Sequence, residues 1–308
     1  MERMTSRHFA HTAAVAGVLL ALVTPLSARN GAAARQGAPP GQSSSHEPPA
    51  AQPSTQGPTP TTPAQGRGRG MAFTEPAPMD FEDHEGYVPL FDGSTLKGWD
   101  GNPRFWRVEA GAIVGESTPA NPSGNSYIVY RGIEAKDFTL KFEIKVEGSG
   151  GSGLQYRSRT GLPWLANIPA NVTANVGPVN LEWMMTGPQA DFWPSRVYTG
   201  QFYSENTPMR ILAWRGQVVE GYGAARKRLM GTIADREALG HVVRMDDWNQ
   251  YTVIARGGTF LHIVNGQLMA AMIDDDPASS NNQAGLFGIE IEATTKVSVK
   301  NLWLKKLN

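Results

Sequence analysis

Strict alternation of apolar and polar residues is the feature that most constrains the fold of this chain. From Asp137 to Glu147 every second residue is apolar, and the residues between them are charged or threonine. This period of two places all the apolar side chains on one face of an extended strand. The pattern is typical of an antiparallel sheet that buries one face and exposes the other.

The alternation recurs in neighbouring segments separated by turn residues, which predicts a sheet built from hairpins. These segments and turns are 251–255, Gly257-Gly258, 259–264, Asn265-Gly266 and 267–273. Asn-Gly readily adopts the positive dihedral angles of a two-residue hairpin turn. Many such short strands occur without an alternating helix rhythm. The sequence therefore predicts an all-β fold, a β-sandwich or jelly roll, over residues 80–308.

Composition excludes several classes of function. The chain has no cysteine, which rules out disulfides, thiol nucleophiles and cysteine-ligated zinc. It has 28 basic and 28 acidic residues, and this balance argues against nucleic acid as a partner. The sequence also lacks the His-Glu-x-x-His motif of zinc proteases and the Gly-x-Ser-x-Gly elbow of serine esterases.

The N-terminal region predicts export followed by a flexible linker. Residues 13–26 form an apolar run behind Arg3 and Arg7, with the length of a secretory signal and not of a membrane span. We expect residues 1–28 to be a signal peptide and the cleaved product to be periplasmic or secreted, without a membrane span; an uncleaved anchor is the alternative. Residues 29–79 are rich in Pro, Gly, Ser and Gln, so we expect a disordered linker.

Several motifs follow one another in an order that resembles a known family. They are Leu90-Phe91-Asp92-Gly93 with Gly98-Trp99, the segments 106–115, 137–140, 151–157, 187–192 and 198–205, Asp247-Trp248-Asn249, 264–267 and 299–305. Together they cover most of the domain and resemble the 3-keto-disaccharide hydrolases, also described as 3-keto-glucoside 1,2-lyases and 2-hydroxyglucal hydratases. The resemblance implies a concanavalin-like jelly-roll sandwich that acts on an oxidised, 3-keto oligosaccharide or glycoside.

Two segments depart from the family pattern. The chain has Gly151 where the resemblance implies an asparagine before Ser-Gly. Near the C-terminal end it has Ile289-Glu290-Ile291-Glu292 where the resemblance implies Leu-Gln-x-His. Two carboxylates therefore replace an amide and an imidazole, which changes both the charge and the proton chemistry of that strand.

The reaction implied by the resemblance begins with deprotonation next to a ketone. A ketone at C3 of a glucoside acidifies the hydrogen on C2, and the enolate formed by its removal expels the group at C1. Water then adds to give a net hydrolysis. The chemistry needs a base, an enolate stabiliser and a donor to the leaving oxygen, and it requires no nucleotide cofactor.

The candidate catalytic residues are Asp191, Arg157 and Glu290. Asp191 and Gln189 lie two residues apart on a predicted strand, so both face one side. Asp191 could be the base or a metal ligand and Gln189 could hold a sugar hydroxyl; solvated strand residues are the alternative. Arg157 follows a Gly-rich turn and could stabilise the enolate oxygen through its guanidinium group, or else form a surface or interstrand ion pair.

Glu290 and Glu292 are expected to share one face of a strand, pointing away from the core. Two neighbouring carboxylates could form an acid–base couple, or they could stand apart in water with ordinary pKa values. A divalent cation such as calcium could also bridge them with Asp191, although no ligand spacing in the sequence specifies such a site.

Three further residues are candidates for substrate binding. Glu205 and Arg210 bracket a short loop, where they could contact the substrate or pair with each other. Trp193 could stack on the C–H face of a sugar ring.

Two alternative functions stay open at this point. The domain could be a non-catalytic carbohydrate-binding module, because sandwich folds often bind sugars without reacting. It could also be an ordinary glycosidase with two carboxylates. The Glu-x-Asp-x-x-Glu strand signature of related sandwich glucanases is absent from the sequence, which argues against the glycosidase.

Overall fold

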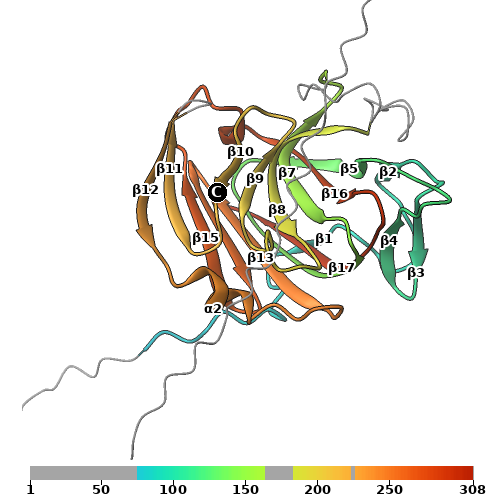
Figure 1. Cartoon of the computed structure of the whole chain (residues 1–308), viewed down its shortest axis with the longest axis horizontal. Helices are drawn as coiled ribbons and strands as arrows, with labels where there is room; N and C mark the ends of the chain where they lie inside the picture. Colours follow the sequence, from blue (N-terminus) through green and yellow to red (C-terminus); the bar gives the residue numbers. More distant parts are fainter. Residues whose placement is uncertain (1–74, 164–182, 223–225, 308) are drawn as a thin grey trace, which may run out of the picture. The chain divides into compact units, whose positions relative to one another are not determined.

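The computed structural model describes residues 75–163, 183–222 and 226–307, which form a domain of two β-sheets (Figure 1). The strands are β1 (Val88–Pro89), β2 (Trp99–Gly101), β3 (Trp106–Glu109), β4 (Ala112–Glu116), β5 (Ser126–Ala135), β6 (Phe138–Gly148), β7 (Ser152–Thr160), β8 (Met185–Phe192), β9 (Phe202–Glu205), β10 (Arg210–Ala213), β11 (Gln217–Tyr222), β12 (Arg226–Thr232), β13 (Asn249–Arg256), β14 (Thr259–Val264), β15 (Gln267–Ile273), β16 (Gly285–Ile291) and β17 (Thr295–Lys306). The described helices are short, namely α2 (Arg236–Gly240) and the 3₁₀ helix η1 (Ser280–Asn282).

The ten-stranded sheet has the order β12-β11-β15-β14-β13-β6-β17-β4-β3, with β1 paired to β17. The seven-stranded sheet has the order β10-β9-β8-β7-β16-β5-β2. Among the described strands the chain crosses between the layers, because β5, β7 and β16 belong to one sheet and β6 and β17 to the other. This arrangement confirms the predicted all-β sandwich of jelly-roll type.

The strands form where the alternation predicts them. β6 pairs with β13, and β13, β14 and β15 form consecutive antiparallel hairpins. Asn265 and Gly266 connect β14 to β15 with φ angles of 49° and 80°, as a tight hairpin turn requires. The register of β17 against β6 shifts between Lys300 and Trp303, which marks a bulge in β17.

The hydrophobic core lies between the two sheets. Phe138 of β6 meets Phe287 of β16 with ring centroids 5.1 Å apart, and Phe202 of β9 meets Phe260 of β14 at 5.2 Å. Each strand therefore uses every second side chain to fill the core. The intervening side chains of the seven-stranded sheet project from its opposite face, where a site can be built.

The predicted signal peptide and almost all of the predicted linker lie outside the described residues. Residues 75–79 are described, and they are exposed and have no regular secondary structure. Within the described ranges, no helix combines the length and apolar character needed to cross a bilayer.

Candidate functional site

A cavity of about 460 Å³ lies beside strands β8, β9 and β10. Most of its wall is polar or aromatic. It is lined by Asn125, Gln189, Asp191, Trp193, Tyr198, Gln201, Tyr203, Glu205, Asn206, Thr207, Pro208, Arg210, Ile211 and Glu292. A concave site of this size with a few convergent polar groups is the usual form of a small-molecule site.

Strand alternation explains why these side chains face the cavity. Phe192 of β8 is part of the core, whereas Gln189 and Asp191 line the cavity on the opposite face. On the adjacent strand β9, Tyr203 and Glu205 line it too, and Tyr203 lies directly across from Gln189 in the strand register. The period of two that fills the core therefore also builds the site.

Glu290 lies behind Gln189 and is not part of the cavity wall. Its carboxyl accepts hydrogen bonds from Gln189 Nε2 at 2.5 Å, Tyr127 Oη at 2.7 Å and Asn125 Nδ2 at 3.0 Å. Gln189 on β8 reaches β16 by passing over β7 at Gly153, where a Cβ would lie 2.7 Å from Gln189 Cγ. Glu290 therefore orients two of the amides that line the cavity.

Substituting Gly153 with alanine is expected to destabilise the fold by about 1–3 kcal/mol, because the added methyl group overlaps the Gln189 side chain. The displaced amide would lose its hydrogen bond to Glu290, so ligand binding should weaken as well. Gly231→Ala is the matched control, since nothing lies within 4 Å of a Cβ at that position. Thermal unfolding of both variants measures the effect, and equal unfolding temperatures would contradict the close packing at Gly153.

Three carboxyl groups line the cavity, and each has a raised pKa with burial as the main cause. Burial raises the pKa of Asp191 well above its usual range, and the charges of Glu290 and Glu292 add to the effect. Burial, followed by the charge of Asp191, raises the pKa of Glu205 to about 8. Burial also raises the pKa of Glu292. These acids hold protons at a higher pH than free carboxyls do.

The carboxyls are held by neutral donors. Gln201 donates from Nε2 to Asp191 Oδ2, and the backbone N–H of Gly151 donates to Glu292 Oε2 at 2.9 Å. Glu205 and Arg210, which the sequence allowed to pair, both line the cavity and make no ion pair with each other. Arg210 is exposed at the rim with a φ of 52°.

Trp193 and Tyr198 form an aromatic wall. Their ring centroids are 4.9 Å apart, with the planes at 67°. The Trp193 indole occupies the space beside Gly151, where a Cβ would lie 2.2 Å from the indole Cε2. The departure from the family pattern at Gly151 therefore makes room for the aromatic wall.

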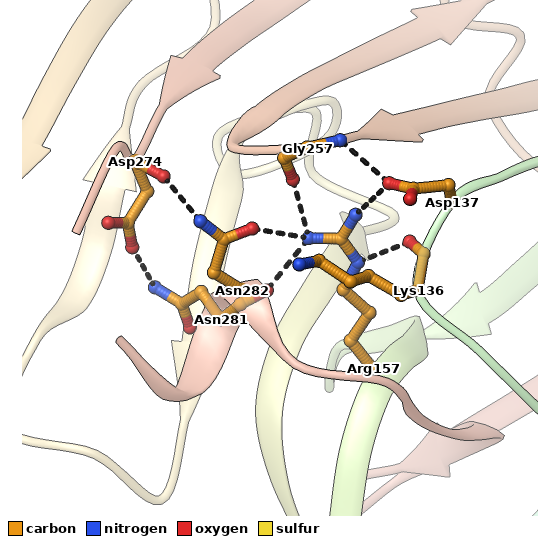
Figure 2. Close-up of polar contacts among 7 residues, drawn as sticks. All are labelled: Lys136, Asp137, Arg157, Gly257, Asp274, Asn281 and Asn282. Carbon is orange, nitrogen blue, oxygen red and sulfur yellow. Dashed lines mark hydrogen bonds and ion pairs between the residues drawn. The ribbon is translucent and has the colours of Figure 1, made fainter. Parts of the chain in front are cut away.

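Arg157 does not line the cavity, so the prediction that placed it there is wrong. Its guanidinium is fully buried elsewhere in the domain (Figure 2). Arg157 donates from Nε to the carbonyl of Lys136 at 2.5 Å and from Nη1 to the carbonyls of Gly257 and Asn281, each at 3.0 Å. Its Nη2 lies 3.3 Å from Asp137 Oδ1. These contacts join separate segments of the sandwich, so Arg157 has a structural role.

The other predicted site residues are brought together around one cavity. Gln189, Asp191, Trp193, Glu205, Arg210 and Glu292 line it, and Glu290 lies directly behind it. Sequence reasoning did not single out Gln201 and Tyr203, although both share the spacing of two with Glu205. That spacing was the available signal. Asn125 carries no comparable signal, because it reaches the site from the far side of Glu290.

The calcium set considered from the sequence does not fit these residues. Within residues 75–163, 183–222 and 226–307, no three His, Cys, Asp or Glu side chains are arranged as ligands of one ion. Glu290 is already engaged by three donors.

A two-sheet sandwich with an acid-lined and aromatic-lined cavity is the form of a carbohydrate-active domain. The chain belongs to the 3-keto-alpha-glucoside-1,2-lyase-like domain family, whose pattern matches residues 86–305. It is 33% identical over 81 residues to a 3-keto-disaccharide hydrolase of Bacteroides thetaiotaomicron, a match that spans 24% of this chain and 28% of that protein.

Solved structures with a similar arrangement of strands include a putative glycosyl hydrolase from Parabacteroides distasonis, with a TM-score of 0.42 and 19% identity over 73% of this chain and 95% of that one. Another is the carbohydrate-binding module CBM66 from Bacillus subtilis, with a TM-score of 0.41 and 16% identity over 68% of this chain and 96% of that one. The family membership rests on the family pattern and not on these distant likenesses.

Proposed function

We propose that this domain is an enzyme that cleaves or hydrates 3-keto-glycosides by removing the proton on C2, with β-elimination of the group on C1. The observation that carries the proposal is the pair Asp191 and Glu205, two buried carboxyls with raised pKa values in one cavity. Acids tuned in this way suit proton transfer near neutral pH. Family membership supports the choice of a 3-keto sugar.

The proposed reaction is an elimination followed by the addition of water. The ionised carboxylate of Asp191 takes the proton from C2, and the electrons of the C–H bond form an enolate with its charge on the C3 oxygen. The enolate reforms the C3 carbonyl as a double bond forms between C1 and C2 and the C1–O bond breaks. The leaving oxygen takes a proton from Glu205. Water then adds its oxygen to C1, its proton returns to Glu205, and Asp191 returns a proton to C2.

Other lining residues have supporting roles in this proposal. Burial raises the pKa of Tyr203, so its hydroxyl stays a neutral donor for the enolate oxygen at any working pH. Arg210 lies at the rim, where it can hold the outer part of the glycoside. Trp193 offers an apolar face for a sugar ring.

The direct test compares a 3-keto-glucoside with the same glucoside unoxidised. We expect release of the aglycone from the ketone alone, together with exchange of the C2 hydrogen in deuterated water, followed by NMR. Turnover of the unoxidised glucoside would indicate an ordinary glycosidase. Binding of either sugar without turnover or exchange would indicate a carbohydrate-binding module, and either result would overturn the proposal.

We also propose that the chain is exported to the periplasm or beyond, since residues 13–26 have the character of a signal h-region. Cell fractionation and N-terminal sequencing of the mature protein test this directly. Recovery of the full-length chain in the cytoplasm would contradict it.

A further inference from the structure

The carboxyl groups around the cavity have no buried counter-charge. Asp191, Glu205 and Glu292 line it and Glu290 lies behind it, and in the described part of the chain none of the four forms an ion pair. Arg210 is the one basic residue among the described lining residues; its charge lowers the pKa of Glu205, but its side chain is exposed at the rim. Because buried carboxylates are normally paired, a ligand with a positive charge would supply what this wall lacks.

One amide oxygen of the cavity wall has no hydrogen-bond donor, which is an independent indication that the ligand carries N–H or O–H groups. Gln189 and Gln201 are 1% and 2% exposed, and each donates its amide nitrogen to a carboxyl, Glu290 and Asp191 respectively. The oxygen of Gln201 is buried with no hydrogen-bond partner. A buried acceptor without a partner is costly, so a ligand that brings an N–H or O–H donor fits this wall.

The spacing of the acids favours an extended organic cation over a metal ion. No three of them converge as ligands of one ion within the described ranges. The acids are instead distributed over β8, β9 and the residue that follows β16. An ammonium group on a sugar would bring one positive charge and three N–H donors, while a ring hydroxyl would donate to the amide oxygen of Gln201.

We propose that the cavity selects glycosides whose sugar carries a protonated primary amine, with the ammonium group held by the carboxylate of Glu292 and with Asp191 and Glu205 left to the proton transfers. The inference rests on the proposed function for the ligand being a glycoside, and it adds the charge of that ligand. It makes Glu292 a specificity-determining residue, because Glu292 has no role in the proton transfers proposed above.

Binding of such a cation is coupled to the protonation of the acids. The titratable groups facing the cavity are Asp191 of β8, Tyr203 and Glu205 of β9, Arg210 of β10, Tyr198 of the loop between β8 and β9, and Glu292 after β16, with Glu290 and Tyr127 behind them. Burial raises the pKa of Tyr203 and of Tyr127, so both stay neutral. An ammonium ion favours the ionised carboxylates, so its binding releases protons. Because burial raises the pKa of Glu292, affinity for a protonated amine should increase with pH as Glu292 ionises.

Calorimetric titration with unoxidised probes tests the selectivity without turnover. The probe is methyl 6-amino-6-deoxyglucoside, whose amine stays mostly protonated at pH 8, and methyl glucoside is its neutral counterpart. At pH 8 we expect the amine to bind about tenfold or more tightly than the neutral sugar. Titrations at pH 7 in two buffers of different ionisation enthalpy should show release of about one proton per amine bound.

Variants and outcomes separate this inference from the proposed function. Glu292→Gln should cut the preference for the amine over methyl glucoside about fivefold or more. Glu237→Gln, on the exposed side of α2, should not change this preference. Equal affinity for amine and neutral sugar would overturn the selectivity, even if 3-keto-glucosides are turned over. Tight amine binding without turnover of any 3-keto sugar would support the selectivity and overturn the proposed function.

Discussion

Replacing Asp191 with asparagine is expected to lower kcat for a 3-keto-glucoside by about 10²–10⁴-fold, the usual contribution of a positioned base. The change keeps the shape of the side chain and an oxygen that can accept the hydrogen bond from Gln201. It removes the ability to take a proton from C2. Initial rates with saturating ketone measure the effect, with C2 hydrogen exchange as the readout of the first step alone.

The same substitution is expected to stabilise the protein at pH 8. The folded pKa of Asp191 is raised above its unfolded value, mainly by burial, so its favourable contribution is complete below the unfolded pKa and is lost as pH rises through the folded pKa. Asparagine does not ionise, so the variant does not lose this stability as pH rises. We expect a gain in the free energy of unfolding at pH 8 and little gain at pH 4, because only the ionised form of Asp191 is destabilised by burial.

Glu237→Gln is the control for removing an acid, since Glu237 is exposed on α2 and is not among the residues that line the cavity. It should change neither kcat nor the pH dependence of denaturant unfolding. A fully active Asp191→Asn variant would remove Asp191 from the role of base. A variant that loses activity and stability together would instead show that the carboxylate is structural.

The alternation in the sequence predicted both the sandwich and the face that carries the site. Gln189 and Asp191 were expected on one side of a strand, and they line the cavity together. The reason is local, since a strand with a buried face fixes the direction of every side chain along it. Glu205 follows the same rule on β9, because the residues that alternate with it, Phe202 and Ser204, are buried on the opposite face of the strand.

The error at Arg157 has a physical cause that alternation cannot show. By spacing alone Arg157 would share a face with Gln155 and Gly153, the face that carries the cavity. The pairing of β7 with β8 shifts register between Gln155 and Arg159, and Arg157 has a φ of 48°. A bulge with a left-handed residue turns the side chain away from the face that the period predicts. Such a bulge depends on the partner strands and not on the local pattern.

The place of Glu290 also depended on tertiary contacts. Its spacing from Glu292 predicted a shared face, and Glu292 lines the cavity while Glu290 is covered by Gln189. That cover exists because Gly153 on the strand between them has no side chain. Burial and a contact across three strands therefore decide which of the two acids can meet a ligand, and neither follows from one strand read alone.

Replacing Arg157 with methionine is expected to destabilise the protein by about 3–5 kcal/mol, the usual cost of breaking a buried charged network by removing one partner. Methionine fills much of the volume but leaves the carbonyls of Lys136, Gly257 and Asn281 without their donor. The ion pair with Asp137 adds less, because that carboxylate is partly exposed. The expected loss therefore comes chiefly from orphaned buried oxygens, and denaturant unfolding measures it.

The contacts of Arg157 explain why the loss should be global and not confined to one loop. The carbonyl of Lys136 and the side chain of Asp137 lie between β5 and β6, and Gly257 lies between β13 and β14 (Figure 2). Asn281 belongs to η1, where its Nδ2 donates to Asp274 at 3.2 Å. One side chain thus fixes loops of both sheets, and Arg157→Lys, with fewer donors in a less rigid group, should recover only part of the stability.

Arg256→Met is the matched control, because Arg256 is an exposed arginine at the end of β13, next to the same turn. It should leave the unfolding free energy within about 0.5 kcal/mol of the parent protein. At a temperature where Arg157→Met stays folded, its kcat/KM for a 3-keto-glucoside should match that of the parent, since Arg157 is not part of the cavity lining. A variant of normal stability that has lost turnover would indicate that Arg157 takes part in the reaction. A variant that has lost stability but keeps normal turnover would establish that Arg157 has the structural role of linking the loops.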